Sequence, residues 1–464
     1  MSLCSQSSFT ASALCFCLAG FTGTWAEAQT QTRQLPIVPG LTEIQKPVAA
    51  AVDTACQTLT GLSTPTTEQA KLLDSCRKMV QTANQLAKVT FNKKFSLDLT
   101  NDQLRDAVQA IGNEEVATNG RSAVETAGGS AIGIRLFALR NGARGFGMVD
   151  AGSAAGANTK SAALRESGGG AADEPGGRIG GFLNVSHNKG DKATTTREDG
   201  FDFDNTGFTT GLDYRFNDNF AGGAAISYGK TDATIASALG TADSQSSALS
   251  LYASWYLDKW FVDGHLSYSR NRYDTVRNIV VVTNSSVEGF RTAALGNTNG
   301  NQFTAVVGTG YDIERGNLLI TPYGRIGALR LRINAYSETE PTNGLALDVG
   351  AQSLKSVQSA FGAKIALTSS TAVGVVVPFV SMEWNHEFAN DTRNLTAKYT
   401  NDPTSGGNFF AIPTDTPDRN YATLSIGASA QFRNGFSSFA TLSTVEGLKD
   451  VKNRGIVVGL RKEF

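Results

Sequence analysis

Three histidines, His187, His265 and His386, are the side chains best suited to acid–base catalysis or metal binding. His265 follows Asp263 by two residues and His386 directly precedes Glu387, but none of the three has the cysteine or second histidine that a metal-binding spacing requires. His265 and His386 are interpreted as ordinary barrel positions, and His187, close to the first predicted long loop, has no acidic or cysteine neighbour in the sequence. We therefore predict no metal or cofactor site.

Two short motifs resemble catalytic signatures, and each fails at one position. Gly229-Lys230-Thr231 ends like a phosphate-binding loop, but Gly223 is one residue too far away and the segment lies within a predicted strand. Gly128-Gly129-Ser130 begins like a hydrolase nucleophile elbow, but Ile132 stands where the closing glycine belongs. Because no serine–histidine pair accompanies them, we predict that the protein is not an enzyme.

The overall composition excludes several classes of protein. The chain has 41 basic and 42 acidic side chains, which gives no reason to expect a nucleic-acid partner. Outside the amino terminus no apolar run reaches the roughly 18 residues of a transmembrane helix. A transmembrane β-barrel remains compatible with the 41% hydrophobic content, because only every second residue of its strands faces lipid.

Residues 1–28 have the pattern of a cleaved signal peptide. A short apolar core spans residues 11–21, and the small residues Ala26 and Ala28 precede a cut at Gln29. No Lys or Arg precedes the core, so the amino terminus supplies the only positive charge. The pattern predicts export by the general secretion machinery, with a disordered leader as the alternative.

Cys56 and Cys76 are the two of the five cysteines that remain after the leader is removed. Apolar residues at helical spacing place them on the inward faces of two helices that are joined by a turn at 61–65. An even number of cysteines in an exported protein predicts a disulfide, with two buried free thiols as the alternative. Such a staple would close a loop of about 20 residues and add about 3 kcal/mol of stability.

The rest of the region before residue 142 also has a helical pattern. Thr100 and Gln103 form a capping box that opens one helix, and a further helix is predicted over 114–140. Residues 142–177 are rich in Gly, Ala and Ser and cannot bury enough apolar area to order themselves. We assign residues 29–141 to a small helical domain and residues 142–177 to a flexible linker.

From residue 178 to the end, apolar side chains alternate with polar, charged or glycine residues, as in strands with one apolar face. Short polar turns lie near residues 217, 258, 316, 369 and 434. Long polar segments predicted as loops lie at 189–204, 232–244, 275–299, 337–351 and 389–419. This alternation predicts an all-β transmembrane barrel of about 12 antiparallel strands, with a soluble β-sandwich or propeller as the alternative.

The two faces of these strands predict two groups of side chains. Aromatic residues beside the short turns are expected to form an interfacial girdle: Tyr214, Phe216, Phe220, Trp255, Tyr256, Trp260 and Phe261. Charged residues on the other face are expected to line the lumen: Asp213, Arg215, Asp263, Arg325 and Glu383.

Residues 454–464 form a last strand with an aromatic carboxy-terminal residue. Phe464 and Leu460 fall on its mostly apolar face, which Lys462 interrupts, while Gly459 falls on the polar or small face. An uncovered strand of this kind would be an aggregation-prone edge in a soluble protein. In a barrel it pairs with the first strand and leaves no edge.

With these residues in place, the chain from residue 178 to residue 464 resembles the autotransporter (type V secretion) family of outer-membrane barrels. The resemblance depends on the order and spacing of several stretches: Gly200 to Asp204, Gly211 to Phe216, Pro322 to Arg325, Glu383 to Phe388, Pro417 to Tyr421 and Gly459 to Phe464.

The resemblance implies a barrel in the outer membrane and an amino-terminal passenger that passes to, or stays at, the cell surface. It also implies a helix that threads the pore, for which 114–140 is the candidate, with Arg135 or Arg140 pairing with Asp213, Asp263 or Glu383. The passengers of this family are commonly long β-helices, whereas the region before this barrel is short and helical.

The family's last strand carries a signal that the barrel-assembly machinery reads, and Gly459, Leu460 and Phe464 match it while Lys462 departs from it. We expect a non-enzymatic translocator, embedded in outer-membrane lipid, that exports or displays its own helical domain. The alternatives are a channel or plugged structural barrel with a periplasmic helical domain and, with the least support, a surface enzyme. Nothing in the sequence identifies a surface ligand.

Overall fold

The structure of the protein, a computed structural model, describes residues 34–112, 178–372, 374–404, 408–432 and 436–464. The signal peptide, the helix predicted at 114–140 and the linker predicted at 142–177 lie outside these residues. No helix within the described ranges is long and apolar enough to cross a membrane.

Three α-helices follow a short 3₁₀ turn, η1 (Leu35–Ile37), and they are α1 (Gln45–Thr60), α2 (Thr67–Leu86) and α3 (Asn101–Ile111). The predicted capping box at Thr100 and Gln103 is confirmed, and α2 begins with a second one at Thr66 and Gln69. The predicted disulfide is also confirmed. It joins Cys56 of α1 to Cys76 of α2, with 5.4 Å between their Cα atoms.

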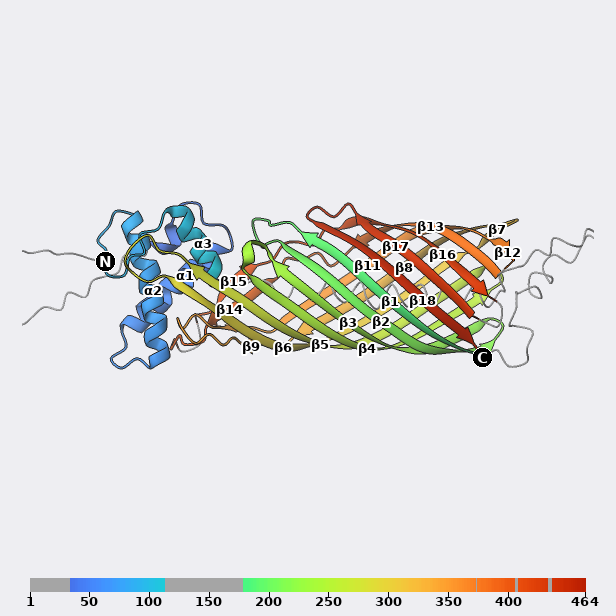
Figure 1. The fold of residues 1–464 in the computed structure, drawn as a ribbon, viewed down its shortest axis with the longest axis horizontal. Helices are drawn as coiled ribbons and strands as arrows, with labels where there is room; N and C mark the ends of the chain where they lie inside the picture. Colours follow the sequence, from blue (N-terminus) through green and yellow to red (C-terminus); the bar gives the residue numbers. More distant parts are fainter. Residues whose placement is uncertain (1–33, 113–177, 373, 405–407, 433–435) are drawn as a thin grey trace, which may run out of the picture. The chain divides into compact units, whose positions relative to one another are not determined.

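Twelve antiparallel strands close into a barrel, as predicted (Figure 1). They are β1 (Ile179–Lys192), β2 (Phe201–Asn217), β3 (Phe220–Ile235), β4 (Gly240–Leu257), β5 (Trp260–Val281), β6 (Phe290–Tyr311), β8 (Leu318–Ile333), β11 (Gln352–Leu367), β13 (Gly374–Glu387), β16 (Asn420–Phe432), β17 (Phe436–Glu446) and β18 (Val451–Glu463). Two three-residue strands, β7 (Ile313–Arg315) and β12 (Ser369–Thr371), extend hairpins at the short turns.

The last strand closes the barrel on the first. β18 pairs with β1 from Lys192 opposite Val451 to Gly180 opposite Glu463, and the N–H of Phe464 donates to the carbonyl of Ile179 over 3.0 Å. The barrel therefore has no free edge. We call the end where β1 begins and β18 ends the turn end, and the opposite end the loop end.

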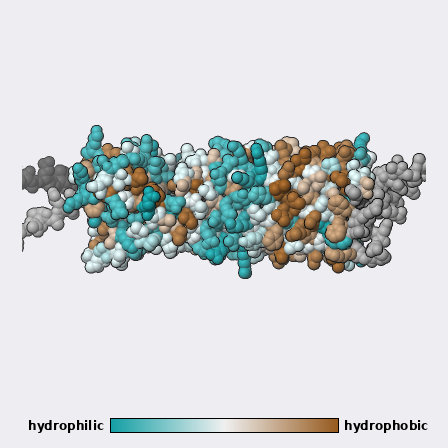
Figure 2. All heavy atoms as spheres, viewed as in Figure 1, coloured by the Kyte–Doolittle hydropathy of each residue, from teal (hydrophilic) through white to brown (hydrophobic). Residues whose placement is uncertain are grey.

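An apolar belt covers the outer wall of the barrel toward the turn end, and a hydrophilic zone adjoins it (Figure 2). On β5 the belt consists of Trp260, Val262, Leu266 and Tyr268, all exposed, and it stops at Arg270. A belt of this kind is about 25 Å tall, whereas the 22 residues of β5 rise roughly 55 Å along a barrel axis at the usual tilt. The strands therefore extend well beyond the belt at the loop end.

This extension corrects the loop predictions. The connection predicted at 232–244 is only residues 236–239, which include the 3₁₀ turn η2 (Ala236–Ala238), and the one predicted at 275–299 is residues 282–289. Beyond the belt the outward positions are mostly polar, and buried apolar residues such as Ile235, Ile279 and Phe290 face inward instead, so the apolar-outward alternation that marks a membrane strand no longer holds.

The segments predicted as loops at 337–351 and 389–419 form a second, four-stranded sheet, whose first strand begins one residue earlier, at Tyr336. Its strands run in the order β15 (Phe410–Pro413), β14 (Asn394–Tyr399), β10 (Leu347–Val349) and β9 (Tyr336–Ser337).

The prediction of an aromatic girdle is also corrected at two positions. Tyr256 and Phe261 are each 3% exposed and point inward, because they alternate with the outward Trp255 and Trp260.

Candidate functional site

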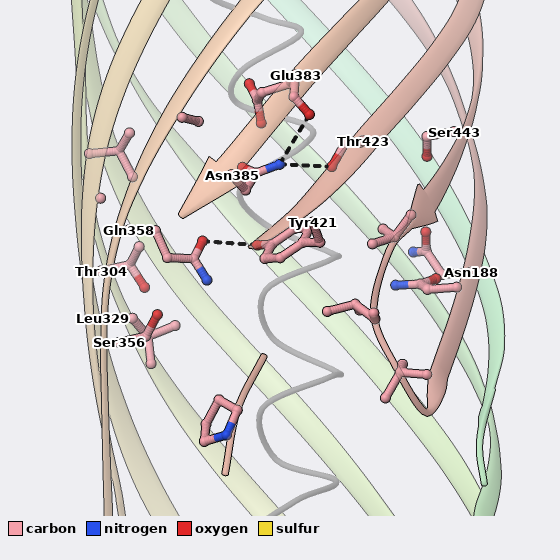
Figure 3. A pocket seen from close by; sticks show the side chains of 18 of the residues that line it. Asn188, Thr304, Leu329, Ser356, Gln358, Glu383, Asn385, Tyr421, Thr423 and Ser443 are labelled. Atoms are coloured by element: carbon pink, nitrogen blue, oxygen red, sulfur yellow. Dashed lines mark hydrogen bonds between the residues drawn. The ribbon is translucent and has the colours of Figure 1, made fainter. Parts of the chain in front are cut away.

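The inner faces of the strands surround a cavity of about 950 Å³ lined mainly by polar side chains (Figure 3). Asn385 donates to the Thr423 hydroxyl over 3.2 Å, and the Tyr421 hydroxyl donates to the Gln358 side chain over 3.2 Å. These bonds connect β11, β13 and β16 across the lumen wall.

A charged pair lies in this wall. Arg325 of β8 donates through Nε to Glu383 of β13 over 3.0 Å and makes a second bond to the same carboxylate through Nη2. β11 lies between the two strands, and its inward residue in register with Arg325 is the small Ala360. The guanidinium can therefore reach across one strand, and both predicted lumen charges are brought together.

The remaining predicted lumen charges lie nearer the turn end. Asp213 is buried 4.0 Å from Arg461, and Asp263 accepts a hydrogen bond of 2.6 Å from the Ser254 hydroxyl. Arg215 is half-buried and takes part in no ion pair with the described residues. The predicted partners of these carboxylates, Arg135 and Arg140, lie outside the described residues, so that pairing stays a prediction.

The residues of the predicted assembly signal lie on both faces of β18. Leu460 and Phe464 are exposed on the outer face, and the Lys462 ammonium lies 4.5 Å from the centre of the Phe436 ring. Gly459 faces inward, where a Cβ atom would stand 2.2 Å from the Phe439 ring and 2.3 Å from the Asn184 side chain. Packing alone thus requires glycine here, and the signal role stays a prediction.

The histidines do not converge. His265 is buried in the lumen wall, His386 contacts Asn420 on the outer face over 2.8 Å, and His187 lies 3.4 Å from Asp204 across a strand pair. The carboxylate beside His187 is a neighbour that the sequence did not indicate. Among the described residues no three His, Cys, Asp or Glu side chains form a group suited to a metal ion.

At the loop end, the helical domain and the barrel share one hydrophobic core. Helix residues such as Val48, Met79 and Val108 belong to the same buried cluster as Leu331 of β8 and Tyr399 of β14. The barrel residues of this cluster include inward-facing positions of β5, β8 and β11. We call the helices together with the four-stranded sheet the cap.

Loops from the barrel hold the helices through polar contacts as well. Asn284, in the β5–β6 loop, donates its backbone N–H to the Leu97 carbonyl over 3.0 Å, and Ser75 of α2 donates to the Asn343 carbonyl over 2.8 Å. Gln109 of α3 donates to Asp199 in the β1–β2 loop over 2.6 Å. Three separate loops therefore bind the helical domain.

Arg277 of β5 also links the barrel to the helices, through an ion pair and several hydrogen bonds. Its side chain is 4% exposed and pairs with Glu338, which is fully buried, through Nη2 and through a 3.2 Å bond from Nε. It also donates to the carbonyls of Ala110 and Ile111 at the end of α3, and to that of Leu345 over 2.9 Å. Burial by itself lowers the pKa of Arg277, but Glu338 outweighs it and raises the pKa. A cation at a helix carboxy terminus also favours the helix dipole.

Glu340 organises the β9–β10 loop that contacts α2. It accepts hydrogen bonds from the Thr292 hydroxyl and from the backbone N–H groups of Thr342, Asn343 and Leu345, at 2.6 to 3.0 Å. Burial alone raises the pKa of Glu340, but these four donors outweigh burial and lower the pKa below its ordinary value of 4.5.

The autotransporter beta-domain family model matches residues 181–443 of this chain. The translocator domain of the autotransporter NalP from Neisseria meningitidis superimposes with a TM-score of 0.51 and 15% identity, covering 76% of this chain and all of that domain. The beta domain of the Bordetella autotransporter BrkA gives a TM-score of 0.44 and 17% identity over 62% of this chain and 100% of that one. A search of curated proteins found no significant match.

Replacing Arg277 with Met should loosen the cap without opening the barrel. The change leaves the Glu338 carboxylate buried without its counter-ion, which costs about 3–5 kcal/mol. We expect faster proteolysis of the helical domain in detergent-purified protein, with unchanged resistance of the barrel to SDS at room temperature. Arg272→Met is the matched control, because Arg272 lies on the same strand but on its exposed outer face. Equal proteolysis of the two variants would contradict the role of Arg277.

The pH dependence of the β9–β10 loop should follow Glu340. A carboxylate with a depressed pKa stabilises the folded state above its unfolded pKa, and this contribution is lost as pH falls through the lower folded value. Glu340→Gln should therefore speed hydrogen exchange of residues 338–346 at pH 7, with a cost of about 1–2 kcal/mol. The difference from wild type should shrink below about pH 4. Glu288→Gln, at an exposed loop position, is the matched control and should change neither the hydrogen exchange of residues 338–346 nor its pH dependence. A constant difference at every pH would exclude the ionised carboxylate as the cause.

Proposed function

Because the chain belongs to the autotransporter family, whose beta-domain model matches residues 181–443, we propose that its barrel exports the helical domain and displays it at the cell surface. The barrel itself is an outer-membrane translocator domain of that family. The observation that carries the proposal is the position of the helices, which pack on the loop end while β1 begins at the turn end.

The chain must connect these two ends. Ile111, the last residue of α3, accepts a hydrogen bond from Arg277, which lies beyond the apolar belt. Ile179, the first residue of β1, pairs with Tyr214 at the opposite end. An even number of strands puts both ends of a barrel domain on the periplasmic side, which makes the loop end the outer one. Export of the helical domain through the barrel accounts for this arrangement.

We propose further that the displayed domain stays attached after export. Its helices complete a hydrophobic core with barrel strands, and a stable core of this kind excludes water from both partners. A passenger built for release has no need of a buried ion pair and three binding loops on its own translocator. Display, rather than secretion, is the outcome that these contacts favour.

The proposal includes no catalytic step. The lumen carboxylates Asp263 and Glu383 have hydrogen-bond partners in the wall, and both are interpreted as structural. The partners that such a protein requires are the general secretion machinery, the barrel-assembly machinery and outer-membrane lipid. A plugged structural barrel is the second candidate, since the shared core includes inward-facing side chains of the barrel strands.

Protease shaving of intact cells tests the export. An epitope inserted into the exposed α1–α2 turn at residues 61–65 should be lost on treatment with protease, because the turn then faces the medium. The matched control is the same epitope in the β4–β5 turn at Asp258, which should be protected until the cells are permeabilised. Protection of both epitopes would place the helical domain inside and favour the plugged barrel. Loss of both would show that the cells were leaky, and the assay would be repeated on intact cells.

Cleavage of the connecting chain tests the attachment. A specific protease site placed between residues 142 and 177 would separate the helical domain from the barrel once it is cut. We expect the fragment to sediment with the membranes through washes in physiological salt and to leave only in denaturant. Arg277→Met should increase its release, whereas Arg272→Met should not. Complete release of the wild-type fragment in mild buffer would contradict retention.

A further inference from the structure

A cluster of basic side chains lies on the outer wall of β5, β8 and β11, directly beyond the apolar belt. The last belt residues there include Tyr268, Phe303 and Val357, all exposed. On β5, β8 and β11 the next outward positions toward the loop end are exposed and basic, whereas β6 carries the uncharged Asn301 there. We call these basic residues the basic patch: Arg270 and Arg272 on β5, Arg330 and Arg332 on β8, and Lys355 on β11.

The strand register packs these charges together. Arg330 lies directly opposite Lys355, and Arg270 and Arg332 both lie opposite Asn301 of β6. Neighbouring strands are about 4.8 Å apart, so the last two arginines are about 10 Å from one another at their backbones. Like charges directly opposite on a sheet destabilise it unless an anion neutralises them.

The described part of the chain does not supply that anion. Only Arg272 has an acidic partner, Asp274 at 3.3 Å, and the other four patch residues make no ion pair within the described ranges. The corresponding zone on β1, β2 and β3 is different. There Lys230 pairs with Asp232 at 2.6 Å, and His187 lies 3.4 Å from Asp204. On that side the outward basic residues also lie beside acidic ones in the strand register, with Lys189 opposite Asp204 and Lys452 opposite Asp191.

We propose that the basic patch binds the phosphate groups of a phosphorylated lipid in the outer leaflet of the membrane. Arginine offers planar donors that match phosphate oxygens, and long basic side chains at the boundary of a bilayer extend toward its head groups. The adjoining belt residues, Tyr268 and Phe303, would lie against the acyl chains of the same lipid. The choice of leaflet rests on the orientation proposed above.

Lipid titration tests this proposal. Full-length protein in neutral detergent is titrated with fluorescent lipid A, a diphosphorylated glycolipid, and binding is followed by anisotropy. The variant carries Arg270→Gln, Arg330→Gln, Arg332→Gln and Lys355→Gln. Its matched control carries Lys189→Gln, Lys230→Gln, Lys452→Gln and Arg454→Gln, four exposed outward positions on the other side of the barrel. Resistance to SDS at room temperature verifies that each barrel is folded. If the fourfold patch variant does not fold, the single substitution Arg330→Gln takes its place.

The patch variant should bind lipid A at least about tenfold more weakly, since each basic residue near an anionic lipid surface strengthens binding by about fivefold. The control should bind like wild type, and dephosphorylated lipid A should bind wild type as weakly as the variant does. Equal affinities of variant and control would overturn the proposal. So would competition by equimolar inorganic pyrophosphate, which would indicate a site for free phosphate. The titration does not depend on the orientation of the barrel or on export, whereas protease shaving measures only these two properties. Lipid binding by the basic patch and export of the helical domain can therefore be disproved independently of one another.

Discussion

Closure of the barrel through β1 and β18 is the constraint on which the rest of the structure depends. In lipid every backbone N–H and C=O group must find a partner within the protein, and an open edge would leave a row of them unpaired. The seam satisfies them from Gly180 to Lys192, with the last bond made by the N–H of Phe464. Once the barrel is closed, alternation along each strand separates the outer belt from the polar lumen.

The strands are longer than the belt requires, and the excess length changes what the protein can do. Beyond the belt, inward residues such as Leu331 and Ile333 no longer line a polar pore and instead join the core of the helical domain. The loop end thus has a globular hydrophobic core that is built partly from barrel strands. Arg277 shows the coupling most directly, since one side chain of β5 contacts α3, the β9–β10 loop and Glu338.

Charged side chains are arranged differently inside the barrel and on its outer wall. In the lumen wall Arg325 and Glu383 neutralise one another across a small residue, Ala360, so the charges are structural and local. On the outer wall Arg330 and Lys355 face one another with no acidic side chain of the described chain between them. A paired charge stabilises the wall, whereas an unpaired cluster at a membrane boundary is typical of a surface that binds anions.

The sequence by itself determined the features that depend on local periodicity. Alternation at residues such as Leu249, Leu251 and Trp255 predicted the strands, their number and the membrane belt, and helical spacing predicted the Cys56–Cys76 disulfide. Only the tertiary structure decided the cap and the basic patch. Arg277 reaches Ala110 across 167 residues of sequence, and Arg330 meets Lys355 only through the register of β8 and β11. Such contacts arise from how distant segments pack, and no local pattern of residue types encodes that packing.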